Sequence, residues 1–199
     1  ELYLQIHHLL LVSPKRNSMK YILLSLLLLG CTSTSYFKSL DQEKVQGLSE
    51  KEAADRFSLV SDVKYSLKFI LTLGEKYSGE NTISFTGLRA DKPLRIDYHE
   101  GTVHGILLNG KNIDVKNYNS RFILIPKNTI KIGENTLKIL FSRNYNNDGS
   151  GLHKFTDPED KKQYLYTDFE PFDANKLFPC FDQPDLKAKY TLEVEAPKN

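Results

Sequence analysis

The strongest constraint on the fold is an alternation of apolar and polar residues that begins at Val63. The apolar positions are Tyr65, Leu67, Phe69 and Leu71, and the polar positions between them are Lys64, Ser66 and Lys68. A period of two residues puts the apolar side chains on one face of an extended chain and the polar ones on the other. The segment therefore predicts a half-buried β-strand.

Further short segments are rich in β-branched or aromatic residues and are separated by Gly, Asn or Pro. They are Asn81–Thr86, Arg95–Tyr98, Gly101–Leu108, Arg121–Ile125, Thr136–Ser142 and Tyr190–Val194. Asn109-Gly110-Lys111-Asn112 has the composition of a tight turn. Many short strands joined by turns favour an antiparallel sandwich or saddle-like sheet over an α/β fold. We predict a mainly β domain.

One segment ahead of these strands has the pattern of a helix. In Leu48–Phe57, Ser49 precedes the helical residues and Glu52 follows three positions later. This spacing is typical of a capping box, in which each residue satisfies a backbone amide of the other. We predict a short N-terminal helix.

The sequence before residue 48 has the layout of an export signal. An apolar run starts after Met19-Lys20 and ends in Leu28-Leu29-Gly30-Cys31. A membrane-spanning helix is the alternative, but it needs about 20 apolar residues, and basic residues at 15, 16 and 20 separate this run from the apolar residues upstream. The end of the run resembles the bacterial lipobox, in which the cysteine is lipidated and becomes the mature N-terminus.

These patterns divide the chain into four parts. Residues 1–18 precede the only methionine, and we expect them to be an upstream or non-native extension. Residues 19–30 are predicted as a lipoprotein signal peptide, residues 31–47 as a tether and residues 48–199 as the β domain. Lipidation at Cys31 would anchor the protein to a membrane of the bacterial cell envelope, facing the periplasm or the exterior.

Charge and cysteine content argue against two classes of protein. The formal net charge is +2, and the whole of that excess lies before residue 30. Binding of nucleic acid through its phosphates needs a basic field, so we expect no nucleic-acid partner. Cys31 and Cys180 are the only cysteines, too few for a disulfide scaffold or a four-cysteine zinc site. Because Cys31 is assigned to the anchor, Cys180 is predicted to be a small buried apolar residue.

The segment His99-Glu100-Gly101-Thr102-Val103-His104 is similar to the zinc motif His-Glu-x-x-His but is one residue too long. Histidines at i and i+4 share a helix face, whereas a separation of five turns the second imidazole away. Gly101 and its β-branched neighbours also favour a strand or hairpin. We therefore predict two surface histidines and no metal ligands here. His153 lies in no recognisable nucleophile motif, and we predict no catalytic residue in this chain.

The region Asn144–Pro184 is long, rich in Asp, Gly, Pro and aromatic residues, and without sustained periodicity. A loop of that length is usually functional or docked on another surface. Within it, Ser150-Gly151-Leu152-His153 and Pro179-Cys180-Phe181-Asp182-Gln183-Pro184-Asp185 resemble the N-terminal domain of the aminopeptidase N family. These zinc metallopeptidases remove single residues from peptide N-termini. The resemblance runs from about Leu48 to Pro197 and implies a saddle-like β domain followed by a thermolysin-like catalytic domain.

Thr167-Asp168-Phe169-Glu170 aligns with a Thr-Gln-x-Glu loop that reaches the active site in this family. The resemblance implies that Glu170 pairs with the free α-ammonium group of the substrate, a charge-assisted contact. Asp168 stands where the family usually has Gln lining the pocket for the first substrate side chain. Its added carboxylate would repel Glu170 or favour basic substrates. Asp173, Asp182 and Asp185 also match the family, and we expect them to fix turns by accepting backbone amides.

The zinc ligands and catalytic glutamate of the family lie on a downstream His-Glu-x-x-His motif that this sequence does not contain. We therefore expect no cofactor in this chain and assign zinc to the full-length family enzyme. The predicted function is that of an N-terminal substrate-recognition fragment, which binds peptide N-termini, is inactive alone and lacks its catalytic domain. Such a fragment would expose an apolar patch. The alternative is a non-catalytic cell-envelope lipoprotein module that binds peptides or another protein.

Overall fold

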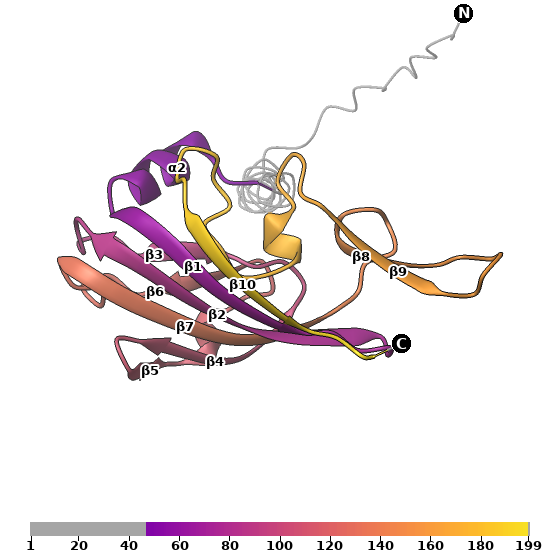
Figure 1. Cartoon of the computed structure of the whole chain (residues 1–199). Coiled ribbons are helices and arrows are strands. Elements are labelled where there is room, and N and C mark those ends of the chain that lie inside the picture. The colour runs from indigo at the N-terminus through magenta and orange to yellow at the C-terminus, as the bar shows by residue number, and fades with distance from the viewer. Residues whose placement is uncertain (1–46, 199) are drawn as a thin grey trace, which may run out of the picture. The chain divides into compact units, whose positions relative to one another are not determined.

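A six-stranded sheet forms the body of the domain (Figure 1). The computed structural model describes residues 47–198, so Cys31, the signal peptide and the tether up to residue 46 lie outside the described residues. The strand order is β10 (Lys189–Glu195), β1 (Val60–Ile70), β2 (Lys76–Gly87), β7 (Gly133–Asn144), β4 (Thr102–Leu108) and β5 (Lys111–Ile113). Neighbouring strands are antiparallel except at one edge, where β10 runs parallel to β1. The mainly β prediction is confirmed.

One face of the large sheet is buried and the other is in contact with water. Alternate side chains of its central strands enter the core: Tyr65, Leu67, Phe69, Ile83, Phe85, Leu137, Ile139 and Phe141. A two-stranded sheet of β3 (Leu94–Asp97) and β6 (Phe122–Ile125) contributes Leu94, Ile96, Ile123 and Ile125 to the same core. The two-residue period seen in the sequence is therefore the period of burial.

The predicted helix is present as α2 (Glu50–Phe57), with Ser49 as its N-cap. The Glu52 amide donates to Ser49 Oγ at 3.3 Å, and the Ser49 amide donates to Glu52 Oε2 at 3.0 Å. This is the reciprocal capping box that the spacing predicts. Arg56 is the one buried residue of the helix.

The predicted turn at Asn109-Gly110 is also confirmed, because both residues have a left-handed backbone, with φ of 52° and 78°. It joins β4 to β5, so Lys111 and Asn112 belong to a short strand and not to the turn. A 3-10 turn, η1 (Val115–Asn117), follows β5. In the described part of the chain, no helix has the length and apolar character to cross a membrane.

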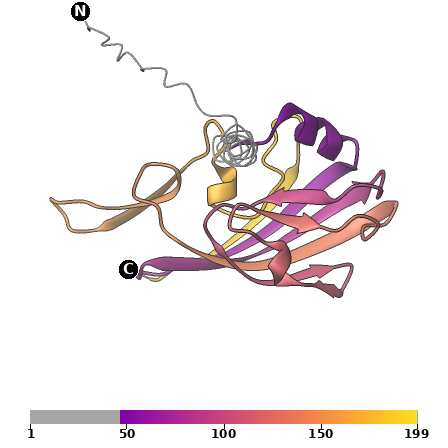
Figure 2. The ribbon, with the colours of Figure 1, turned by 180° about the vertical axis from the view of Figure 1, so that it is seen from behind.

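The region 144–184 differs from its prediction as an irregular loop. It contains an antiparallel hairpin of β8 (Gly151–Thr156) and β9 (Gln163–Asp168), followed by the 3-10 turn η2 (Ala174–Lys176). The hairpin extends away from the large sheet in both views (Figures 1 and 2). Every residue of β9 is exposed. Because neither face of β9 is buried, its sequence has no need of the alternation that marks the other strands.

Candidate functional site

Asp168 is the last residue of β9, and Glu170 follows two residues later. Both residues are exposed in the part of the chain that the structure describes. Asp168 Oδ1 accepts the backbone N–H of Glu170 at 3.2 Å. The peptide bond between Glu170 and Pro171 is cis. The two carboxylates therefore differ in their contacts: one oxygen of Asp168 holds the backbone of Glu170, whereas the Glu170 side chain is exposed.

The base of the hairpin is held by polar contacts on both sides of it. Lys176 Nζ donates to Ser150 Oγ at 3.0 Å and forms an ion pair with Asp173 Oδ1 at 2.9 Å. Asn146 Nδ2 donates to the Ser150 carbonyl at 2.7 Å. Gly151 has a φ of +61°, and a Cβ there would lie 2.8 Å from Lys176 Cβ. Glycine is therefore required where β8 starts, and it lets the hairpin leave the domain beside η2.

An apolar groove of about 530 Å³ opens between the hairpin and the edge of the large sheet. Leu152, Thr167 and Phe169 line it from the hairpin side. Leu67, Phe69 and Leu71 line it from β1 and its C-terminal end, and Tyr190, Leu192 and Val194 from β10. The three β10 side chains are 60%, 62% and 49% exposed. The exposed apolar patch predicted from the sequence is thus present, and it lies beside the loop that carries Glu170.

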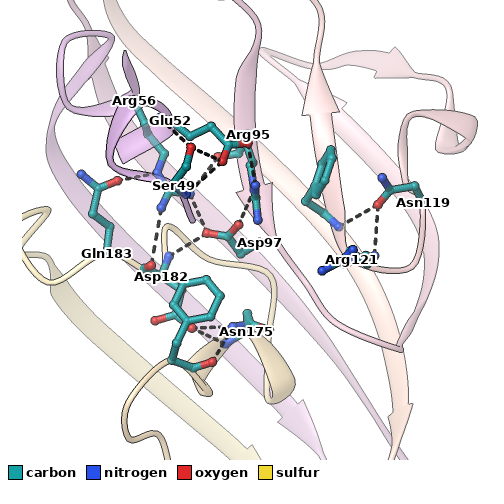
Figure 3. Close-up of polar contacts among 12 residues, drawn as sticks. Ser49, Glu52, Arg56, Arg95, Asp97, Asn119, Arg121, Asn175, Asp182 and Gln183 are labelled. Carbon is teal, nitrogen blue, oxygen red and sulfur yellow. Dashed lines mark hydrogen bonds and ion pairs between the residues drawn. The ribbon is translucent and has the colours of Figure 1, made fainter. Parts of the chain in front are cut away.

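The chain after Glu170 is fixed to the core by a polar network (Figure 3). Asp182 Oδ2 accepts from the Asn175 amide at 2.9 Å and from Asn175 Nδ2 at 2.7 Å. Burial raises the pKa of Asp182, while the bonds from Asn175 oppose that shift. The Asp182 backbone N–H donates to Asp97 Oδ2 at 3.3 Å. The predicted turn-fixing role of Asp182 is therefore present, and its partner Asn175 is a residue that carries no motif in the sequence.

Asp97 links this segment to the helix. Its carboxylate accepts from Arg56 Nη1 at 2.6 Å and from Arg95 Nε at 2.7 Å. Arg56 Nε donates to Gln183 Oε1 at 2.8 Å. Arg56 and Asp97 are 2% and 1% exposed. Such a pair is costly to desolvate, and its hydrogen bonds to further partners compensate that cost. The pairing of residues 56, 97 and 183 is distant in sequence, and no local pattern indicates it.

The remaining titratable candidates do not form a chemical centre. His104 lies on the exposed side of β4, where the predicted strand is confirmed, and its Nε2 is 2.8 Å from Ser142 Oγ. His99 is half-buried, so its prediction as a surface histidine is wrong, because it lies against Arg143 and Glu100 after β3 ends. Cys180 is 2% exposed, as predicted, and burial raises its pKa. Among residues 47–198, no three His, Cys, Asp or Glu side chains lie close enough to hold a metal ion.

Comparison with known proteins connects this geometry to one family. A model of the Peptidase M1 N-terminal domain family matches residues 61–199. Aminopeptidase N from Streptomyces lividans is 36% identical over 155 residues, which are 76% of this chain and 18% of that protein. Human glutamyl aminopeptidase is 48% identical over 44 residues, 22% of this chain and 5% of that protein. The chain thus spans less than a fifth of the length of these relatives.

Solved structures show the same fold at lower identity. Leukotriene A4 hydrolase from Saccharomyces cerevisiae matches with a TM-score of 0.59 and 21% identity, covering 71% of this chain and 24% of that one. An M1 zinc metallopeptidase mutant from Deinococcus radiodurans, bound to a Tyr-Ser-Ala substrate, matches with a TM-score of 0.53 and 17% identity, covering 70% and 33%. From its match over residues 61–199 and the β architecture that it shares with these structures, the chain belongs to the Peptidase M1 N-terminal domain family.

Proposed function

We propose that this chain is the part of a zinc aminopeptidase that recognises the free N-terminus of a peptide, with Glu170 as the anchor for the α-ammonium group. The observation that carries the proposal is the exposed Glu170 side chain two residues after β9, the second strand of a hairpin that projects from the domain (Figure 1). A carboxylate and an ammonium group form a charge-assisted pair once a substrate excludes water from them. A peptide with a blocked N-terminus would leave the carboxylate unpaired and would bind more weakly.

Asp168 acts on the same substrate from the preceding strand. The hydrogen bond from the Glu170 amide occupies Asp168 Oδ1, and the side chain remains exposed. A second negative charge beside the ammonium site attracts a basic first side chain and repels an acidic one. We therefore expect a preference for substrates that begin with Lys or Arg.

Hydrolysis needs groups that the described residues do not supply. A zinc aminopeptidase site requires three protein ligands and a general base near an open metal position, and residues 47–198 contain no cluster of the required side chains. The His, Cys, Asp and Glu side chains of residues 47–198 do not form a set of ligands that fits zinc. In the proposed function, the metal and the base belong to a catalytic domain such as the longer M1 relatives possess, and this chain alone binds without cleaving.

A chimeric enzyme tests the proposal. Residues 47–199 replace the matching part of the Streptomyces lividans aminopeptidase N, and kcat/KM is measured on leucine and lysine arylamides with zinc present. We expect Glu170→Gln to lower kcat/KM by roughly 30-fold or more, which corresponds to the roughly 2 kcal/mol or more that truncation of a buried charge pair costs. Glu159→Gln, which removes a carboxylate at the exposed tip of the same hairpin, is the matched control.

Two results would decide against this function. Equal activity of the Glu170→Gln and Glu159→Gln chimeras would show that Glu170 does not bind the substrate amine. Cleavage of arylamides by the 199-residue chain alone, abolished by a chelator, would show that the chemistry resides in this chain. For Asp168, a lysine-to-leucine preference that Asp168→Asn leaves unchanged would remove its role in specificity.

Cys31 lies outside the described residues, and its role is proposed from the sequence. We expect radioactive palmitate to be incorporated into the chain in a bacterial host and to be lost in Cys31→Ala. Export without lipid, with cleavage elsewhere, would show an ordinary secretory signal in place of an anchor.

A further inference from the structure

A buried arginine connects the large sheet to the β8–β9 hairpin. Arg143 lies in β7, on the core side of the sheet, and is 7% exposed. Its Nη2 donates to Asn146 Oδ1 at 3.1 Å. Its Nε and Nη1 are buried too, and they have no hydrogen-bond acceptor among residues 47–198. The bond to Asn146 is therefore the contact through which this guanidinium holds another segment of the chain.

Asn146 contacts the hairpin with both its backbone and its side chain. Its amide donates to the Leu152 carbonyl at 2.8 Å, and its carbonyl accepts from the Lys154 amide at 2.9 Å. These bonds place Asn146 along the edge of β8 that faces away from β9, because successive residues of a strand direct their hydrogen-bonding groups to opposite sides. Its Nδ2 also donates to the Ser150 carbonyl at 2.7 Å and to Ser150 Oγ at 3.1 Å. One residue thus holds both the start of β8 and its outer edge.

The end of β8 that Asn146 holds is the end beside Glu170. In the β8–β9 register, Gly151 lies opposite Asp168. Glu170 follows Asp168 by two residues, and its backbone N–H donates to Asp168 Oδ1 at 3.2 Å. Asn146 is therefore connected to the backbone of Glu170 through two neighbouring strands, and a shift of β8 at this end moves Glu170 with it.

The contacts of Arg143 compensate its burial only in part. The Glu100 carboxylate lies 3.8 Å from Arg143 Nη2, beyond hydrogen-bond distance, and is 67% exposed. A buried charge is costly to desolvate, and an apolar side chain of similar volume in its place is often neutral or stabilising. Replacement of Arg143 by Met leaves no buried partner unpaired, because Glu100 is exposed and Asn146 is half-buried. The orientation of the hairpin, and not the stability of the sheet, is then the property that depends on this arginine.

We propose that Arg143 and Asn146 are positioning residues, which hold the β8–β9 hairpin in the orientation that brings Glu170 to a peptide N-terminus. The consequence for substrate binding rests on the proposed function of Glu170, whereas the hold on the hairpin rests on contacts within this chain. Precise placement matters because a displacement of about 1 Å in a catalytic site can reduce the rate by about 100-fold.

Amide hydrogen exchange of the full 199-residue chain tests the hold on the hairpin without any assay of activity. We expect Arg143→Met and Asn146→Ala each to accelerate exchange of the Lys154 amide by roughly tenfold, the effect of losing one hydrogen bond to a charged group. The amides of β2 should keep their wild-type rates, and the urea midpoint of Arg143→Met should be no lower than that of wild type. Lys138→Met is the matched control, because it removes a cation from the opposite face of β7, where Lys138 pairs with Glu80. It should leave the hairpin amides unchanged.

The chimeric enzyme described above tests whether the pair acts through Glu170. Arg143→Met should lower kcat/KM on leucine arylamide by roughly tenfold, whereas Lys138→Met should not. In a chimera that already carries Glu170→Gln, Arg143→Met should cause little further loss, because residues that act through one another are not additive. Arg143→Lys keeps a cation and a donor for Asn146, and it should recover part of the loss.

Three outcomes would overturn the proposal. Unchanged exchange of the hairpin amides in both variants would show that the bond between Arg143 and Asn146 does not hold the hairpin. Faster exchange in β2 as well, with a lower urea midpoint, would make Arg143 a residue of the general fold. Equal losses of kcat/KM with and without Glu170→Gln would show that the pair does not act through Glu170. A failure of the proposed function looks different, because Glu170→Gln alone would then leave kcat/KM unchanged while the hairpin amides still exchange faster.

Discussion

Two regions of this domain differ in how their polar and apolar groups find partners: the network around Arg56 and Asp97, and the surface formed by β9 and β10. Around Arg56 and Asp97, charged side chains are 2% and 1% exposed and are bonded to Arg95 and Gln183 (Figure 3). Along β9 and β10, every residue is exposed, including the large apolar side chains beside the groove. The network completes its hydrogen bonds within the chain, whereas β9, β10 and the loop after β9 expose a carboxylate and an apolar surface in the described residues. The difference separates what holds the fold from what is available for binding.

The largest change in the free energy of unfolding is expected from removing the Asp97 carboxylate. Asp97→Ala leaves Arg56 and Arg95 without their shared acceptor in a buried site. Breaking a buried ion pair in this way costs about 3–5 kcal/mol of the free energy of unfolding. Urea denaturation followed by circular dichroism measures it. Lys51→Ala, which removes an exposed ion pair with Asp55, is the control and should change stability far less, because water screens an exposed pair. Equal losses of stability in Asp97→Ala and Lys51→Ala would show that the buried network around Asp97 does not stabilise the fold more than an exposed ion pair does.

A pair of aliphatic truncations compares the core with the exposed strand β10 directly. Ile139 is fully buried in β7, whereas Leu192 in β10 is 62% exposed. We expect Ile139→Ala to cost about 2–5 kcal/mol through lost burial and a cavity. Leu192→Ala should stay within about 0.5 kcal/mol of wild type. If Leu192→Ala destabilised the domain as much as Ile139→Ala, the β10 face would be part of the core.

The N-cap of α2 is a stabilising feature that depends only on residues close together in the sequence. Ser49→Ala removes both the acceptor for the Glu52 amide and one side of the capping box. The expected loss of stability is about 1 kcal/mol. Ser49→Asp, which keeps an acceptor at the N-cap, should recover most of it, and failure to recover would indicate that the cap is not the cause.

The smallest change in stability is expected from lowering the pH. Burial lowers the pKa of His99 from 6.5, and the cations Arg143, Lys176 and Arg121 act in the same direction, against Glu100. A histidine with a lowered folded pKa binds fewer protons in the folded state than in the unfolded state, so stability falls as pH drops from about 6.5 toward the folded pKa. Urea midpoints between pH 7 and pH 5 should show this slope, and His99→Gln should reduce it. A slope that His99→Gln leaves unchanged would show that another group causes it.

The sequence predicts the buried part of the domain and its helix cap better than the exposed β8–β9 hairpin. The strand that begins near Val63 could be predicted because burial of one face gives a periodic pattern. The capping box at Ser49 could be predicted because a helix cap depends on residues close together in the sequence. The β8–β9 hairpin was not predicted, because an exposed strand is under no pressure to alternate. The Asp182–Asn175 contact was half predicted: the aspartate stood out, whereas an asparagine seven residues away has no distinguishing signal.

By itself, the sequence determined the mainly β class, the helix cap, the Asn109-Gly110 turn and the family to which the chain belongs, since each depends on residues close together or on a motif. Tertiary structure alone decided that β10 lies parallel to β1 at one edge of the described sheet, and that Arg56, Asp97 and Gln183 meet in one buried network. It also decided that the groove adjoins the loop of Glu170. These features arise from the packing of segments distant in the chain, and the free energy that selects them is shared among contacts that no single segment contains.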